Sequence, residues 1–125
     1  MEQKVCLDTD VCISIIKGEN KSKQVGDLIG SGKLFVSAVT VFELHLRKEN
    51  IDDVTQLLDG IVILNFNNAC AIRASEISKE LQSDGFTVDF RDIFIASTAL
   101  YNGCTLATFN KKHFSKIKEL KLLNI

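Results

Sequence analysis

Hydrophobic residues along this chain form short continuous runs that alternate with longer segments in which they recur every three or four positions. The short runs are rich in Val, Ile, Leu and Thr and are bounded by polar residues or glycine: KVCL, KLFVSA, IVILNF and CTLAT. Such runs are typical of buried strands in a parallel sheet. LKLL near the end of the chain is a weaker candidate for a fifth strand.

The longer segments have the periodicity of amphipathic helices. They cover residues 10–17, 20–30, 40–49, 51–58 and 69–82, and the segment DFRDIFIASTALYNG. In the segment 69–82, the residues predicted to share the buried face are Ile72, Ala74, Ile77 and Leu81. The alternation predicts an α/β fold of three layers, with helices on both faces of a central parallel sheet of four or five strands.

Composition limits the kinds of protein that the chain can be. It has 125 residues, 46% of them hydrophobic, with no proline and no low-complexity segment, so we expect one domain over residues 1–125. The four cysteines include no CxxC pair, which favours free core thiols in a reducing compartment. There is no signal-peptide pattern and no apolar stretch of about 18 residues, so we expect a cytoplasmic protein without a membrane span.

The net charge of −1 conceals a basic end of the chain. From Lys111 to Ile125 there are five lysines and one acid, Glu119. This distribution is typical of a solvated face and is also compatible with binding to nucleic acid.

Acidic and hydroxyl side chains follow the predicted strands. In parallel α/β sheets ligands bind beyond the carboxyl ends of the strands, so polar residues at these junctions are candidates for function. They are Asp8 and Asp10 after the first strand, Ser37, Thr40 and Glu43 after the second, Thr108 and Asn110 after the fourth, and Asp89 and Asp92 at the start of the last long helix.

Helix capping is the structural alternative for most of these residues. Thr40 and Glu43 have the spacing of a capping box. Asp10, Asp89 and Asn110 are suitable N-caps, and Asp92 would be favoured by a helix dipole.

Asp8 differs, because a carboxylate directly after a buried strand costs several kcal/mol if it stays unpaired. Carboxylates that gather at one sheet edge repel one another unless a cation is present. Oxygen ligands without His or Cys favour Mg²⁺ or Mn²⁺ over Zn²⁺.

Four segments together resemble the PIN-domain family, most closely its VapC-type ribonuclease toxins. They are LDTDVCIS, SAVTVFEL, DIFIASTAL and ATFNKKHF, in this order and spread over nearly the whole chain. The resemblance implies that Asp8, Glu43 and Asp92 bind Mg²⁺ or Mn²⁺ and catalyse hydrolysis of RNA phosphodiester bonds.

The resemblance also implies roles for the surrounding residues. Ser37, Thr40, Thr108 and Asn110 would support the acidic centre, and Asp10 and Asp89 are further supporting or second-metal residues. Many relatives have Asn where this chain has Asp10, and some have a fourth acid near Asn110, so the number of metal ions stays open. Possible RNA-binding residues are Lys111, Lys112, His113 and Arg91.

Two other functions fit parts of the sequence. DTDVCIS also resembles the first motif of haloacid-dehalogenase-like phosphatases, but those enzymes need a lysine and a later acidic pair, and beyond Asp92 this chain has only one acid, Glu119. A PIN-like domain could instead bind RNA or a partner without cutting.

A VapC-type toxin further implies a cognate VapB-type antitoxin and a homodimer. Apolar residues in the two consecutive helices exceed what one core face needs, although extra core is the simpler explanation: Leu44, Leu46, Ile51, Val54, Leu57 and Leu58.

Overall fold

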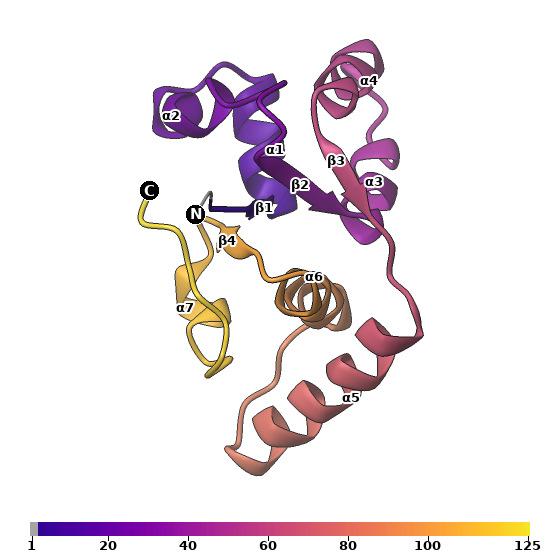
Figure 1. The fold of residues 1–125 in the computed structure, drawn as a ribbon, viewed down its shortest axis with the longest axis vertical. Helices are drawn as coiled ribbons and strands as arrows, with labels where there is room; N and C mark the ends of the chain where they lie inside the picture. Colours follow the sequence, from indigo (N-terminus) through magenta and orange to yellow (C-terminus); the bar gives the residue numbers. More distant parts are fainter. Residues whose placement is uncertain (1–2) are drawn as a thin grey trace.

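The computed structural model describes residues 3–125, which form a four-stranded sheet in the order β3-β2-β1-β4 (Figure 1). The strands are β1 (Val5–Leu7), β2 (Leu34–Ser37), β3 (Val62–Leu64) and β4 (Thr105–Ala107). All three pairings are parallel, as predicted. The weaker fifth strand is reduced to one parallel bridge between Leu106 and Leu122.

Helices cover both faces of the sheet (Figure 1). They are α1 (Thr9–Ile16), the short turn η1 (Asn20–Ser22), α2 (Lys23–Gly26), α3 (Ala38–His45), α4 (Ile51–Asp59), α5 (Asn68–Ser83), α6 (Phe90–Tyr101) and α7 (Lys111–Phe114). The predicted α/β architecture is confirmed. The segment 20–30 is less helical than predicted, because it divides into η1 and the four residues of α2.

Alternation along the strands divides the core into two clusters. In β1, Val5 and Leu7 face the cluster under α1, α3 and α4, whereas Cys6 faces the cluster under α5 and α6. This follows from the twofold repeat of a strand, which sends successive side chains to opposite faces. Because helices cover both faces of the sheet, β1 is apolar at all three of its positions.

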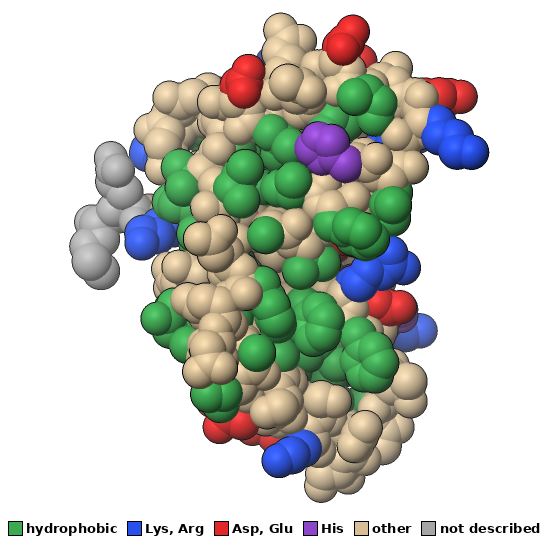
Figure 2. All heavy atoms as spheres, turned by 90° about the vertical axis from the view of Figure 1, so that its right-hand side faces the viewer, with side chains coloured by type: hydrophobic (Ala, Val, Ile, Leu, Met, Phe, Trp, Pro, Cys, Tyr) green, Lys and Arg blue, Asp and Glu red, His purple; other side chains and the backbone are tan. Residues whose placement is uncertain are grey.

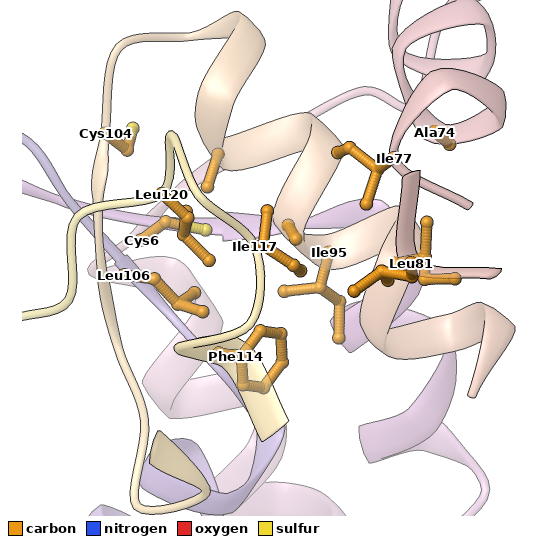
Figure 3. Packing of buried hydrophobic residues seen from close by; sticks show 13 residues of the cluster. Cys6, Ala74, Ile77, Leu81, Ile95, Cys104, Leu106, Phe114, Ile117 and Leu120 are labelled. Carbon is orange, nitrogen blue, oxygen red and sulfur yellow. The ribbon is translucent and has the colours of Figure 1, made fainter. Parts of the chain in front are cut away.

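The C-terminal segment closes the second cluster. Phe114, Ile117 and Leu120 are buried beside Leu106 of β4 (Figure 3). An ion pair of 2.6 Å between Arg73 and Glu119 fastens this segment to α5. The packing also fixes the loop that runs from β4 into α7, which carries candidate site residues.

Two predictions about burial were wrong. Strand β3 was expected to be buried, but Val62 and Ile63 are exposed because β3 is an edge strand. Ile72 was expected on the buried face of α5 and is 56% exposed. Cys70 is buried with the rest of that face instead, one turn before Ala74.

The cysteine prediction is confirmed, since all four thiols are buried and free within the described residues. None of the helices in residues 3–125 has the length and apolar character to cross a lipid bilayer.

Phe114 provides a test of the core. Replacement by Ala (Phe114→Ala) should lower the free energy of unfolding by about 3–5 kcal/mol, because the ring is completely buried. Phe90→Ala is the matched control, since this ring is 70% exposed, and it should cost less than about 0.5 kcal/mol. Urea denaturation measures both, and equal losses would contradict the assigned packing.

Candidate active site

The register of β1 against β4 brings together LDTDVCIS and ATFNKKHF, the first and last of the four segments that resemble the PIN-domain family. Leu7 pairs with Ala107, so the next residues, Asp8 and Thr108, leave the sheet side by side. The backbone N–H of Asp8 donates to the Ala107 carbonyl at 2.9 Å. Since β1 has β2 on its other side, this is the point where the strand order reverses, which is where open α/β sheets bind ligands.

Asp8 is held by hydrogen bonds on both of its carboxylate oxygens. Oδ1 accepts from the backbone N–H of Thr9 at 2.8 Å, and Oδ2 accepts from the Thr108 hydroxyl at 2.8 Å. The residue is only 6% exposed. Burial, and then the neighbouring charge of Asp10, raise the pKa of Asp8 to about 7, although both hydrogen bonds oppose the change.

The structure reverses the expected capping roles of the first two aspartates. Asp8 is the N-cap of α1, whereas Asp10 lies in the first turn of that helix. One carboxylate oxygen of Asp10, Oδ2, accepts from the backbone N–H of Phe109 at 3.1 Å. The other, Oδ1, is buried and has no hydrogen-bond partner within residues 3–125.

Glu43 reaches the same region from α3. Its Oε1 accepts from the Thr9 hydroxyl at 2.7 Å, and that hydroxyl lies 3.1 Å from the hydroxyl of buried Thr40. The predicted capping box is wrong, because α3 begins earlier than expected and Ser37 is its N-cap, accepting from Val39 N–H at 3.0 Å.

Thr9 was missed by the sequence analysis, which considered only acids and the polar residues after the later strands. In the sequence, its place between Asp8 and Asp10 was the available signal. In the structure, Thr9 begins α1, which packs against α3.

Asp89 and Asp92 lie at the start of α6. Asp89 is the predicted N-cap and accepts from the backbone N–H of Arg91 at 2.9 Å. Partial burial, and then the charges of Asp89 and Glu43, raise the pKa of Asp92, while the nearby His113 lowers it. The charge of Asp92 is thus influenced by residues of two other elements, Glu43 of α3 and His113 of α7.

The loop after β4 supports Asp8. Thr108 Oγ1 accepts from the backbone N–H of Asn110 at 3.0 Å, which leaves its own proton directed at Asp8. Asn110 is at the N-cap position of α7 without making a side-chain cap, and its amide nitrogen lies 3.0 Å from Nδ1 of His113. Lys111 turns away and donates to the backbone oxygen of Ile125 at 3.0 Å.

The donor set fits a hard divalent cation. The atoms available as metal ligands are the carboxylate oxygens of Asp8, Asp10, Glu43 and Asp92. The oxygen Oδ1 of Asp10, which has no hydrogen-bond partner within residues 3–125, is suited to be a ligand. In the described part of the chain, no three His, Cys, Asp or Glu side chains are already arranged to hold a metal ion together. Binding would therefore require some of these side chains to rotate, and Oε2 of Glu43 would have to separate from Arg91.

Comparison with known proteins identifies the family. The family model of the PIN domain matches residues 5–120, and the chain belongs to this family. It is therefore not a haloacid-dehalogenase-like phosphatase. The chain is 28% identical over 125 residues to the tRNA(fMet)-specific endonuclease VapC of Shigella flexneri, covering 94% of this chain and 95% of that protein. It is 29% identical over 123 residues to ribonuclease VapC1 of Methanocaldococcus jannaschii, covering 97% and 86%.

Solved structures share the fold. VapBC2 from Rickettsia felis, bound to a DNA fragment from its promoter, contains a chain that matches with a TM-score of 0.83 at 24% identity, covering 98% of this chain and 99% of that one. FitAcB from Neisseria gonorrhoeae matches with a TM-score of 0.75 at 22% identity, covering 96% of each chain.

The protonation of Asp8 predicts how stability depends on pH. With a folded pKa of about 7 against an ordinary 3.8, native Asp8 holds a proton that the unfolded chain has lost between about pH 4 and pH 7. In metal-free protein the free energy of unfolding should therefore fall as pH rises through this range. Asp8→Asn should flatten the fall, measured by urea denaturation at several pH values.

Asp59→Asn is the control for this experiment, because Asp59 is an exposed residue at the end of α4. It should keep the parent's slope. An equally steep fall in Asp8→Asn would show that Asp8 ionises normally in the folded protein.

Proposed function

We propose that this protein is an endoribonuclease that requires Mg²⁺ or Mn²⁺ and acts as the toxin of a type II toxin-antitoxin pair in the cytoplasm. The observation that carries the proposal is the set of carboxylates at the reversal point of the sheet, with one buried oxygen of Asp10 left without a partner in residues 3–125. The curated relatives add support, since they are named as ribonucleases and as a tRNA endonuclease.

Asp8, Glu43 and Asp92 are the residues that would hold the cation. When bound, the cation would lower the pKa of a water molecule and offset charge on the RNA phosphate. Thr108 and Thr9 keep Asp8 and Glu43 in place through their hydroxyls. The free oxygen of Asp10 would be available as a further ligand of the cation.

Basic residues around the centre would bind the RNA backbone. Arg91 and His113 lie next to the acids, and Lys112 is exposed on α7. Lys111 would first have to leave the carbonyl of Ile125. Phosphate contacts of this kind add affinity and make binding sensitive to salt, without reading the sequence of the RNA.

A VapB-type antitoxin is the proposed partner. The support is that solved structures with this fold include VapBC2 from Rickettsia felis and VapBC from Salmonella typhimurium, each a toxin with its antitoxin. An antitoxin that covers the acidic centre would keep RNA away from it.

A second copy of this chain is the other proposed partner. Hydrophobic side chains gather over the middle of one face, with charged side chains mainly around its margin (Figure 2). Exposed apolar residues lie on α3, at its C-cap and on β3: Phe42, Leu46, Val62 and Ile63. An unpaired edge strand with two exposed apolar residues favours association. Of the helical residues expected to be in excess, Leu44, Val54 and Leu57 are buried and Leu46 and Ile51 are exposed.

Cleavage of single-stranded RNA tests the enzymatic proposal. With Mn²⁺ present, the parent should cut a fluorescent RNA, and Asp92→Asn should slow cleavage by about 100-fold or more because a ligand carboxylate is lost. Asp59→Asn removes a carboxylate that is exposed at the end of α4 and has no contact with the acidic centre among the described hydrogen bonds and ion pairs, so this variant should cut like the parent. Removal of divalent cations with EDTA should stop cleavage, and Mn²⁺ should restore it.

Three results would oppose this function. Equal cleavage by Asp92→Asn and the parent would mean a contaminating nuclease, and RNA binding without cleavage by the parent would favour a non-catalytic module. Fast hydrolysis of an aryl phosphate that is lost in Asp8→Asn would indicate a phosphomonoesterase instead.

Light scattering after size exclusion tests the homodimer. The parent should elute as a dimer at micromolar concentration, and Ile63→Lys should give a monomer because a charge would be buried at the interface. Tyr101→Lys is the control, since Tyr101 is 55% exposed at the end of α6, and it should stay dimeric. A monomeric parent would contradict the proposed interface.

A further inference from the structure

Arg91 joins two elements of the acidic centre. It is the second residue of α6, and its Nη1 lies 3.6 Å from Oε2 of Glu43 on α3. Its Nε lies 3.7 Å from Oδ1 of Asp89, the oxygen that also caps its backbone N–H. One guanidinium therefore links the α6 N-terminus to a candidate metal ligand that is 48 residues earlier in the chain.

Arg91 also brings positive charge to a group of carboxylates. Among the ion pairs within residues 3–125, those of Arg91 are the only ones that involve the acids of the centre. The other polar contacts to Asp8, Asp10 and Glu43 come from hydroxyls and backbone N–H groups, which carry no net charge. Arg91 is thus the intramolecular counter-ion of the centre.

The contact with Glu43 is loose enough to be exchanged. Charge-assisted hydrogen bonds between N–H donors and carboxylates are about 2.7–2.9 Å long, and both Arg91 pairs exceed this. The Arg91 side chain is 50% exposed. By contrast, Arg73 is 23% exposed and lies 2.6 Å from Glu119, a distance typical of a direct charge-assisted hydrogen bond.

The two oxygens of Glu43 have different roles. Oε1 is fixed by the Thr9 hydroxyl at 2.7 Å, so Oε2 is the oxygen that faces Arg91. A divalent cation that uses Glu43 would need the charge that the guanidinium now neutralises. After release from Glu43, the planar guanidinium would stand beside the centre with donors suited to a phosphate.

We infer that Arg91 is a positioning residue that exchanges partners: it pairs with Glu43 in the metal-free protein, competes with the divalent cation for that carboxylate, and binds the RNA phosphate once it is displaced. This inference rests on the proposed metal-dependent function and adds a defined order of events to it. It separates Arg91 from the lysines of α7, which have no contact with the acids among the described ion pairs.

Titration of the metal-free protein with Mn²⁺, followed by calorimetry without RNA, tests the competition. Arg91→Gln should bind Mn²⁺ about two- to fivefold more tightly than the parent, the change expected from loss of one exposed ion pair that opposes binding. Arg91→Lys, which keeps the charge, should lie between the two. Lys79→Gln removes an exposed charge from α5 and should stay close to the parent.

Cleavage kinetics with saturating Mn²⁺ test the second half of the exchange. Arg91→Gln should raise KM for single-stranded RNA more than it lowers kcat, and Arg91→Lys should recover part of the loss. Tighter Mn²⁺ binding together with a higher KM would support the inference, because a merely structural role would not move the two in opposite directions. Thermal melting of each variant checks that it is folded.

The failures are distinguishable. If the parent neither binds Mn²⁺ nor cuts RNA, the proposed function is wrong and the inference falls with it. If the parent does both and Arg91→Gln binds Mn²⁺ no more tightly than the parent, the inference alone is overturned.

Discussion

The register between β1 and β4 is the constraint on which the acidic centre depends. It places Asp8 next to Thr108, 100 positions later in the chain. The Thr108 hydroxyl can therefore donate a hydrogen bond to the Asp8 carboxylate and fix its orientation. A slip by one residue would exchange the faces of Cys6 and Leu7, each of which packs in a different core cluster. The packing of β1 on both of its faces therefore fixes the position of Asp8, which follows the strand.

Neutral groups make most of the direct contacts that hold the acids in place, and among the described residues Arg91 is the one cation that forms ion pairs with them. Asp8 is the N-cap of α1 and Asp92 lies in the first turn of α6, positions where the helix dipole favours negative charge. Burial and mutual repulsion act in the opposite direction and raise the pKa of both carboxyls. With hydroxyls and N–H groups as the main partners, little of the negative charge of the ionised acids is neutralised by cationic side chains within residues 3–125.

Much of the fold follows from the sequence, because continuous apolar runs and helical periodicity are local signals. Burial was less predictable: the apolar run of β3 resembles that of β1, and only the order of the strands makes Val62 an edge residue. The acids of the candidate site could be located from the sequence because junctions between strands and helices can be predicted from such runs. Their capping roles could not be predicted in the same way, since capping depends on helix boundaries, and the N-caps lie three residues earlier than expected at Ser37 and two residues earlier at Asp8.

Asp10 shows most clearly what side-chain geometry adds to the fold. An asparagine at this position could still accept the Phe109 N–H through its amide oxygen, so that contact alone does not require a carboxylate. What a carboxylate adds is a second acceptor and a negative charge, and the second oxygen is the one that is buried without a partner among the described residues. A buried acceptor left in this state costs free energy that no contact within residues 3–125 offsets. The unpartnered oxygen is therefore the observation that most supports the proposed cation, of which Asp10 would be a ligand beside Asp8.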